Sequence, residues 1–156
     1  MKTTPGVFIV ESLKFSDEDC DRREGLILSD ILRLARTPAD YRYIRTTKEL
    51  KAILEQFERS GMRYLHLSCH GNRDCIALTL DTLSFEEFGG MVRPYLRGRR
   101  LFVSACSTVN KALALSIMPQ SDCWSVIGPR GDIAFDDAVL MWASFSIWHL
   151  RKIRRQ

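Results

Sequence analysis

The sequence predicts an α/β fold in which helices flank a mostly parallel, doubly wound sheet in a three-layer sandwich. Short apolar runs rich in β-branched residues alternate along the chain with segments whose apolar residues recur at helical spacing. The composition, 46% hydrophobic and 27% charged residues in a chain of 156, is that of a globular protein with one core. No internal repeat or linker divides the chain, so we expect residues 1–156 to form a single domain.

The first half of the chain is predicted to hold two strand–helix units. Thr37-Pro38 ends the first helix, because a residue before proline avoids the helical conformation. Thr46 or Thr47 caps the second helix with its side-chain oxygen. In chain order the predicted elements are a strand at 6–11, a helix that starts near 16–19, an edge strand at 41–45 and a helix that ends at 60–61.

The second half continues this alternation and adds an inserted β-hairpin. Ser84 and Glu87 form a capping box that opens a helix, and Asp136-Asp137 caps the last helix. The predicted elements are a strand at 63–69, a turn at 72–74 with a short hairpin strand at 76–80, a helix from 84, a strand at 99–104, a helix at 109–118, a strand at 124–128 and a helix from 136.

The last helix is apolar on nearly every face and too short to span a membrane. Such a helix is either buried on two sides or covered by a partner chain in a homo- or hetero-oligomer. The net charge of +4 comes partly from a basic tail, which we interpret as a solvated helix end rather than a nucleic-acid contact. The tail residues are Arg151, Lys152, Arg154 and Arg155.

The five cysteines, in a chain without a signal peptide, predict a reducing, cytoplasmic setting. Their spacing does not match a structural zinc site, and His66 and Cys69 point to opposite faces of one strand. We therefore predict no metal and no cofactor. Cys69 and Cys123 are expected to be small buried hydrophobic residues, and His66 a hydrogen-bonded core histidine that supports the site.

One cysteine and one histidine stand where catalytic groups lie in this class of sheet. His70-Gly71 follows the strand at 63–69, and Cys106 follows the strand at 99–104. Active sites of doubly wound sheets lie outside the carboxyl ends of the strands. If the two strands are neighbours, about 4.8 Å apart, the side chains at their tips can meet. An imidazole beside a thiol activates it for attack on a carbonyl, and the backbone N–H groups of Gly71 and Cys106 are candidates for an oxyanion hole.

Two motifs around these residues resemble the paired signature of CHAT domains, the caspase-like (clan CD) cysteine peptidases related to caspases and separase. The first is LHLSCHG at residues 65–71, and the second is SACST at residues 104–108. The resemblance covers most of the chain from about residue 60, but the segment after Thr108 is short and lacks the glycine-rich loop often found there. It implies a caspase-like sheet, with His70 as the base and Cys106 as the nucleophile.

The same resemblance implies a function. It is that of an endopeptidase that cuts a specific partner protein, encoded by a neighbouring gene, in prokaryotic defence or programmed cell death. The loop at 129–132 stands where such proteins often build the P1 pocket. Within it Asp132 would suit a basic P1 residue and Arg130 an acidic one, and of the two the basic preference is favoured.

Two alternatives stay open at this point. One is a catalytically inactive CHAT-like module that binds a partner through the last helix, with Trp142, Phe145 and Trp148 as contacts. The other is a flavodoxin-like or nucleotide-binding fold. It is less favoured, because the residues after the first strand, 11–14 (ESLK), are not a glycine-rich phosphate loop.

Overall fold

A computed structural model describes the backbone of residues 3–154 and their side chains, except those of Gln120 and residues 151–154. The strands are β1 (Thr4–Ser12), β2 (Ala39–Tyr43), β3 (Met62–Gly71), β4 (Cys75–Ala77), β5 (Thr82–Ser84), β6 (Arg100–Ser104) and β7 (Ser125–Ile127). The helices are α1 (Phe15–Asp19), α2 (Glu24–Leu34), α3 (Thr47–Ser60), α4 (Phe85–Val92), α5 (Lys111–Ile117) and α6 (Phe135–Arg154), with 3-10 turns η1 (Arg93–Tyr95) and η2 (Met118–Gln120).

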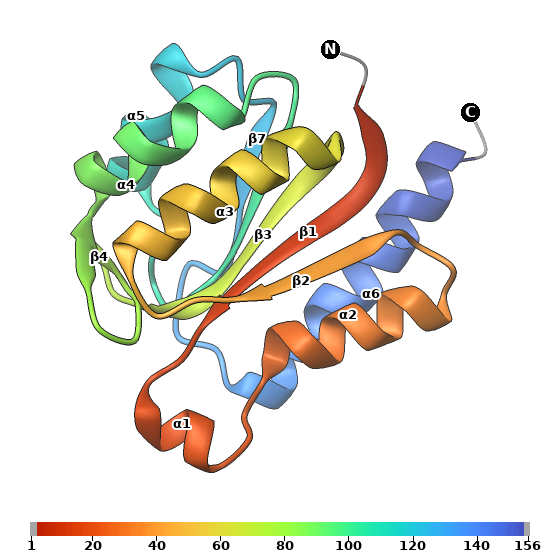
Figure 1. Cartoon of the computed structure of the whole chain (residues 1–156), viewed down its shortest axis with the longest axis horizontal. Coiled ribbons are helices and arrows are strands. Elements are labelled where there is room, and N and C mark those ends of the chain that lie inside the picture. Colours follow the sequence, from red (N-terminus) through yellow and green to blue (C-terminus); the bar gives the residue numbers. More distant parts are fainter. Residues whose placement is uncertain (1–2, 155–156) are drawn as a thin grey trace.

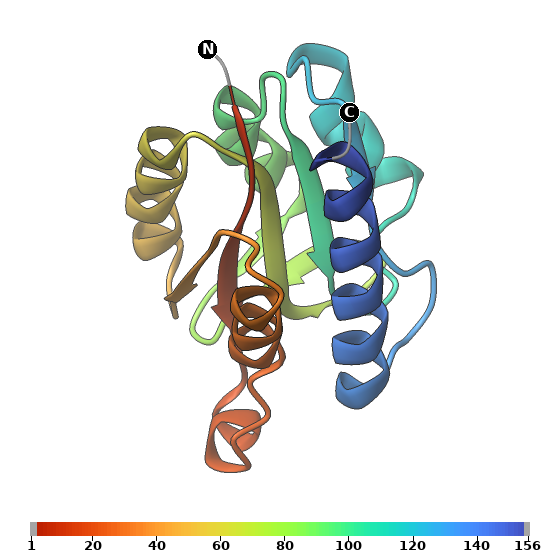
Figure 2. The same ribbon diagram turned by 90° about the vertical axis from the view of Figure 1, so that its right-hand side faces the viewer.

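The sheet has five parallel strands in the order β2-β1-β3-β6-β7, and a hairpin of β4 and β5 extends it antiparallel to the end of β3. Helices α3, α4 and α5 cover one face, and α2 and α6 cover the other (Figures 1 and 2). The predicted doubly wound sandwich with an inserted hairpin is therefore confirmed. The strand order reverses between β1 and β3, which makes the carboxyl ends of these two strands the topological switch point.

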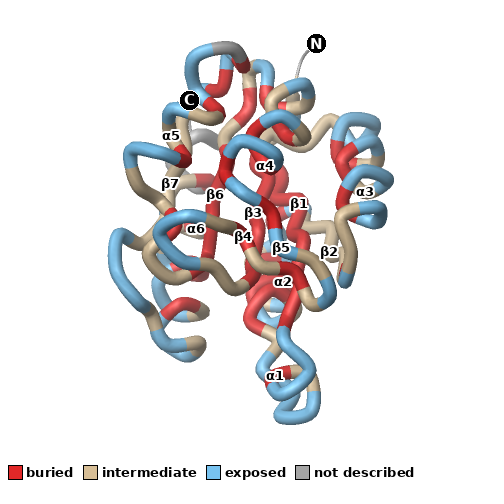
Figure 3. The backbone as a smooth tube through the Cα atoms, turned by 90° about the vertical axis from the view of Figure 1, so that its left-hand side faces the viewer, coloured by how far each residue is buried: buried red, intermediate tan, exposed pale blue. Residues whose placement is uncertain are grey.

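The central strands are buried on both faces, as parallel strands between two helical layers must be. Along β1, Phe8 and Val10 enter the core under α3, whereas Val7 and Ile9 enter the core under α2 and α6. Figure 3 shows the result as a buried set of strands inside a shell of helices with exposed outer faces. Several polar side chains are buried at or beside the carboxyl ends of the strands, where the candidate site lies: Glu11, Ser12, Asp17, Glu24, Ser68, Ser104 and Thr108.

Local signals account for most helix boundaries. Ser84 forms the expected capping box with Glu87. Of the two predicted caps, Thr46 is the one that caps α3, in a second capping box with Glu49. Helix α5 differs from the prediction, because it begins at Lys111 rather than near 109. The physical reason is Asn110, whose side-chain oxygen accepts the N–H groups of Ala112 and Leu113 and so fixes the start of the helix.

Helix α6 packs one face on the sheet and on α2, so it is not buried on two sides. Trp142 is only 1% exposed and stacks on Phe102, whereas Leu140 and Trp148 are 67% and 64% exposed. The interpretation of Trp142 as a partner contact is therefore wrong: the core already holds it. No helix within the described part of the chain is long and apolar enough to cross a membrane. The side chains of the basic tail, Arg151, Lys152, Arg154 and Arg155, lie outside the described residues.

Candidate active site

The register of β3 and β6 brings His70 and Cys106 to the same place. Ser68 pairs with Ser104, the last residue of β6, and His70 and Cys106 each follow two residues later along the chain. Both follow the alternation that points toward the α2 and α6 layer. They line one small cavity of about 40 Å³, together with Glu24 and Phe135. The prediction that the two strands are neighbours is confirmed, and the catalytic roles of the two residues stay predictions.

The imidazole of His70 is held by a carboxylate from another strand end. Its Nε2 lies 2.7 Å from Oδ2 of Asp17, which sits on α1 directly after β1 and is 8% exposed. Arg22 pairs with the other oxygen of Asp17 at 3.7 Å, and Phe135 meets the His70 ring edge-on at 5.8 Å. When Nε2–H donates to Asp17, the other ring nitrogen, Nδ1, is an acceptor and can take a proton.

Sequence reasoning treated residues 16–19 only as the start of a helix and missed Asp17. The signal that could have found it is topological. An acidic residue just after β1 reaches the same sheet edge as His70, because β1 and β3 run parallel as neighbours at the switch point. Asp17 therefore meets the same criterion that identified His70 and Cys106, a position just after the carboxyl end of a strand.

Cys106 lies at a sharp turn between β6 and α5. The next residue, Ser107, has a left-handed backbone (φ 54°), a conformation that side chains disfavour and that surrounding contacts must hold. Its N–H donates to the carbonyl of Gly131 (3.1 Å) and its hydroxyl to Asp132 Oδ1 (3.0 Å). The Cys106 thiol donates to the carbonyl of Ile133, with Sγ and O 3.7 Å apart. The segment after β7 thus covers the thiol and fixes its turn.

Gly71 is required where β3 meets this turn. A Cβ at this position would lie 2.3 Å from Cγ2 of Thr108 and 2.9 Å from the carbonyl oxygen of Cys75. The missing side chain lets the end of β3 approach the residues that follow Cys106. The predicted oxyanion role of the Gly71 and Cys106 N–H groups stays a prediction.

The two residues expected in the P1 pocket have different surroundings. The carboxylate of Asp132 accepts the Ser107 hydroxyl and so belongs to the turn that presents Cys106. Arg130 instead lines a cavity of about 590 Å³ on the other side of Ser107, along with Arg73 and Lys111.

A cluster of buried polar side chains borders the small cavity lined by His70 and Cys106. One oxygen of Glu24, Oε2, accepts the hydroxyls of Ser68 (3.1 Å) and Ser104 (2.9 Å). Its other oxygen lies 3.6 Å from Nε2 of His66, a fully buried ring that meets Trp142 edge-on. His66 is therefore a core histidine as expected, but the expected hydrogen bond is wrong, because neither ring nitrogen has a hydrogen-bond partner among the described residues. Cys69 and Cys123 are buried as predicted, and burial raises the pKa of both thiols.

The amino terminus of α2 is occupied by a carboxylate of the protein itself. Oε1 of Glu11 accepts the N–H of Gly25 at 2.7 Å, and its Oε2 accepts the hydroxyl of Tyr41 at 2.7 Å. Burial raises the pKa of Glu11. In nucleotide-binding relatives of this architecture, the phosphate sits at the helix that follows the first strand. Here Glu11 takes that position, which disfavours the nucleotide-binding alternative.

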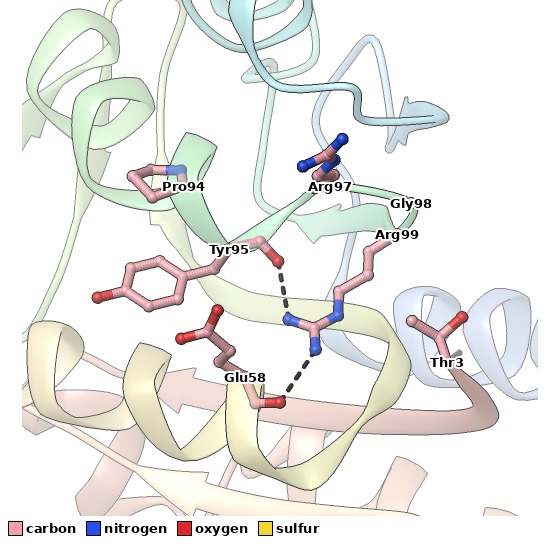
Figure 4. Close-up of a pocket in the computed structure, with 7 residues that line it drawn as sticks. All are labelled: Thr3, Glu58, Pro94, Tyr95, Arg97, Gly98 and Arg99. Atoms are coloured by element: carbon pink, nitrogen blue, oxygen red, sulfur yellow. Dashed lines mark hydrogen bonds between the residues drawn. The ribbon is translucent and has the colours of Figure 1, made fainter. Parts of the chain in front are cut away.

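A second large cavity, of about 600 Å³, lies at the opposite end of the sheet (Figure 4). The guanidinium group of Arg99 forms its inner wall. It donates to the carbonyls of Tyr95 (2.9 Å) and Glu58 (3.1 Å) and lies 4.4 Å from the centre of the Phe57 ring. These contacts make Arg99 a structural clamp between η1 and α3. No cysteine or histidine lines this cavity among the described residues.

The described residues contain no group of three or more His, Cys, Asp or Glu side chains that could hold a metal ion.

No protein-family model matches the chain, and no curated protein matches it. Similar solved structures include a 3-dehydroquinate dehydratase-like protein from Bifidobacterium longum, 13% identical over 94% of this chain and 98% of that chain, with a TM-score of 0.48. A flavodoxin from Megasphaera elsdenii is 13% identical over 91% of this chain and 98% of its own, with a TM-score of 0.44. A lysine decarboxylase from Francisella novicida is 13% identical over 95% of this chain and 18% of its own, with a TM-score of 0.48. Likenesses at this level concern the course of the chain and carry no argument about function.

Proposed function

We propose that this protein is a cysteine endopeptidase of the CHAT type, in which Cys106 is the nucleophile and His70 the general base. The observation that carries the proposal is the shared cavity at the carboxyl ends of β3 and β6, lined by both residues. The carboxylate of Asp17 supports it, because an oriented imidazole is what a cysteine nucleophile needs.

The geometry suits a two-step acyl transfer. The Cys106 thiol gives its proton to Nδ1 of His70, and Sγ attacks the carbonyl carbon of the scissile bond. As the C–N bond breaks, His70 returns the proton to the leaving amine, and a thioester to Cys106 remains. His70 then deprotonates a water molecule that hydrolyses the thioester and restores the thiol. Through Nε2, Asp17 holds the ring and stabilises the imidazolium that forms in each step.

The biological setting rests on the CHAT resemblance alone. We propose that the substrate is a specific partner protein, encoded by a neighbouring gene, and that cleavage takes place in the cytoplasm. Prokaryotic defence and programmed cell death are the processes in which such a cleavage would act.

Cleavage of a peptide library, and of the protein encoded by the neighbouring gene, tests the proposal. We expect Cys106→Ala and His70→Ala to abolish cleavage while the far-ultraviolet circular dichroism spectrum and the melting temperature stay close to wild type. Cys20→Ala is the control, because Cys20 is an exposed cysteine that does not line the cavity of His70 and Cys106, and it should cleave at the wild-type rate. Wild-type cleavage by the Cys106 or His70 variant would show that the dyad assignment is wrong.

The second candidate function is a catalytically inactive module that binds a partner through α6. The exposure of Leu140 and Trp148 on that helix favours it. One pair of variants distinguishes the two candidate functions. If the protein is an inactive module, Leu140→Glu weakens partner binding and Cys106→Ala leaves that binding unchanged. If the protein is an enzyme, Cys106→Ala abolishes cleavage.

A further inference from the structure

The layer formed by α2 and α6 carries an exposed apolar surface. Half of the exposed large apolar side chains of the described residues lie on these two helices: Ile27 and Leu34 on α2, and Leu140, Met141 and Trp148 on α6. Leu140 and Trp148 are 67% and 64% exposed. Helix α6 lies along the outside of the molecule for its whole length (Figure 2). Single exposed apolar residues are common, but a cluster of them on one layer marks a candidate interface.

The exposed positions of α6 are arranged symmetrically about Ser144. Leu140 and Trp148 lie four residues to either side of it, and positions 137 and 151 lie seven residues to either side. Asp137, Leu140, Ser144 and Trp148 are all exposed. Positions four and seven residues apart share one side of a helix, so they form a single stripe. A stripe that is symmetric about its centre is self-complementary when two copies pack antiparallel, as a two-fold interface requires.

The two ends of α6 carry opposite charges. Asp136 and Asp137 lie in the first turn, both are exposed, and neither forms an ion pair with another described residue. The sequence from position 151 onward is basic, with Arg151, Lys152, Arg154 and Arg155. An antiparallel pair sets the acidic start of each helix beside the basic end of the other, whereas a parallel pair sets like charges together. Charge complementarity therefore favours a second, antiparallel copy of the same helix.

We propose that this surface is the interface of a symmetric homodimer, in which the α6 helices of two copies of the chain pack antiparallel and cross at Ser144. Leu140 of each copy then lies against Trp148 of the other. The small side chain of Ser144 at the two-fold axis lets the helix axes approach to about 8–10 Å, the usual packing distance. Burial of apolar side chains that are exposed in the single chain provides the main stabilisation.

The homodimer leaves the candidate active site complete within each copy. Helix α6 begins at the cavity of His70 and Cys106, where Phe135 and Ala138 line the wall. In an antiparallel pair the two cavities therefore lie at opposite ends of the interface. The dimer does not depend on the proposed peptidase function, so Cys106→Ala should dimerise as the wild type does.

Sedimentation equilibrium of the full-length protein tests the dimer. At concentrations from about 1 to about 200 μM, we expect the mass to rise from that of one chain to that of two. Leu140→Glu and Trp148→Glu should each raise the dissociation constant about 100-fold or more, because each buries an unpaired charge at the centre of the interface. Leu115→Glu is the matched control, since Leu115 is 60% exposed on α5, which covers the other face of the sheet. It should leave the dissociation constant unchanged.

Cysteine cross-linking tests the direction and the centre of the pair. Ser144→Cys should form a disulfide-linked dimer under mild oxidation, identified by mass spectrometry of the linked peptide, because position 144 meets itself at the axis. Asp137→Cys should not link to itself, because its two copies are about 21 Å apart along the helix, beyond the reach of a disulfide. A mixture of Leu140→Cys and Trp148→Cys should link the two variants to each other.

Each outcome decides the proposal. The mass of a single chain at every concentration overturns the homodimer. A dimer that neither Leu140→Glu nor Trp148→Glu weakens overturns its location on α6. Self-linking of Asp137→Cys without linking of Ser144→Cys overturns the antiparallel arrangement. Circular dichroism shows whether the glutamate variants fold, and the Ser144→Cys result decides the proposal if they do not, because it introduces no charge.

Discussion

At the scale of single residues, the orientation of His70 depends on Asp17. The 2.7 Å contact occupies Nε2, so Nδ1 is the ring nitrogen left to exchange a proton, and Asp17 itself pairs with Arg22 at 3.7 Å. Within the described part of the chain, the Cys106 thiol donates only to the backbone carbonyl of Ile133, so no charged side chain orients it. The geometry of the proposed catalytic pair therefore depends on residues on both sides of the switch point.

Asp17→Asn tests this dependence. Asparagine keeps the size of the side chain but removes the charge that stabilises the imidazolium and can favour the wrong tautomer of His70. We expect kcat for peptide cleavage to fall by about 100-fold or more, with KM and the melting temperature little changed. Asp19→Asn, an exposed position on the same helix, is the control. An unchanged kcat in Asp17→Asn would assign Asp17 a purely structural role.

At the scale of elements, the site exists because the end of β3 packs closely against the turn after β6. Thr108 is fully buried there and donates its hydroxyl to the carbonyl of Ala105 at 3.0 Å, so it has little freedom to move. The absence of a side chain at Gly71 leaves room for its methyl group.

Gly71→Ala should therefore destabilise the fold by about 1–3 kcal/mol, the usual cost of overpacking, and should lower activity. The added Cβ would meet Thr108 Cγ2 at 2.3 Å. Removing that methyl group in the Gly71→Ala/Thr108→Ser double variant should recover part of the loss, as measured by urea unfolding. Gly90→Ala offers a control, since a Cβ there meets only the end of the Arg93 side chain at 3.8 Å. Equal stabilities of the Gly71 and Gly90 variants would contradict this packing.

At the scale of the whole molecule, the fold buries acidic groups between α2 and the sheet, and this makes stability depend on pH. Burial raises the pKa of Glu11, so the folded protein binds that proton more tightly than the unfolded chain does. The stabilisation from this group is fully present below the ordinary glutamate pKa, about 4.3, and is lost as the pH rises through the raised value.

Glu11→Gln should remove this dependence. The free energy of unfolding of wild type minus that of Glu11→Gln is expected to fall as the pH rises from acidic toward neutral, in urea titrations at matched ionic strength. Glu18→Gln provides the opposite case. Arg45 and Tyr43 lower the pKa of Glu18, so its stabilisation is present above the ordinary pKa and is lost as the pH falls. A difference that stays flat for Glu11→Gln would mean that this carboxyl is not buried in the folded state.

The sequence predicted most of the elements and two residues of the candidate site, because both depend on local signals. It nevertheless joined α1 and α2 into one helix and missed β5. Apolar spacing, proline and capping boxes such as Ser84 with Glu87 act within a few residues. The positions of His70 and Cys106 followed from strand ends in a parallel sheet. Asp17 also follows a strand end, but its contact with His70 and the cavity of Arg73, Lys111 and Arg130 have no local sequence signal. They depend on which segments the strand order brings together, and no local pattern specifies that order.

The selective reactivity of Cys106 is the most direct test of the whole proposal. Native protein is treated with iodoacetamide at neutral pH, and the labelling of each cysteine is followed by mass spectrometry. We expect Cys106 to react about tenfold or more faster than the exposed Cys20, and His70→Ala to remove that advantage. Cys69 and Cys123 should stay unlabelled, because burial raises the pKa of their thiols. Equal rates at Cys106 and Cys20, or an advantage that persists in His70→Ala, would contradict the His70–Cys106 dyad.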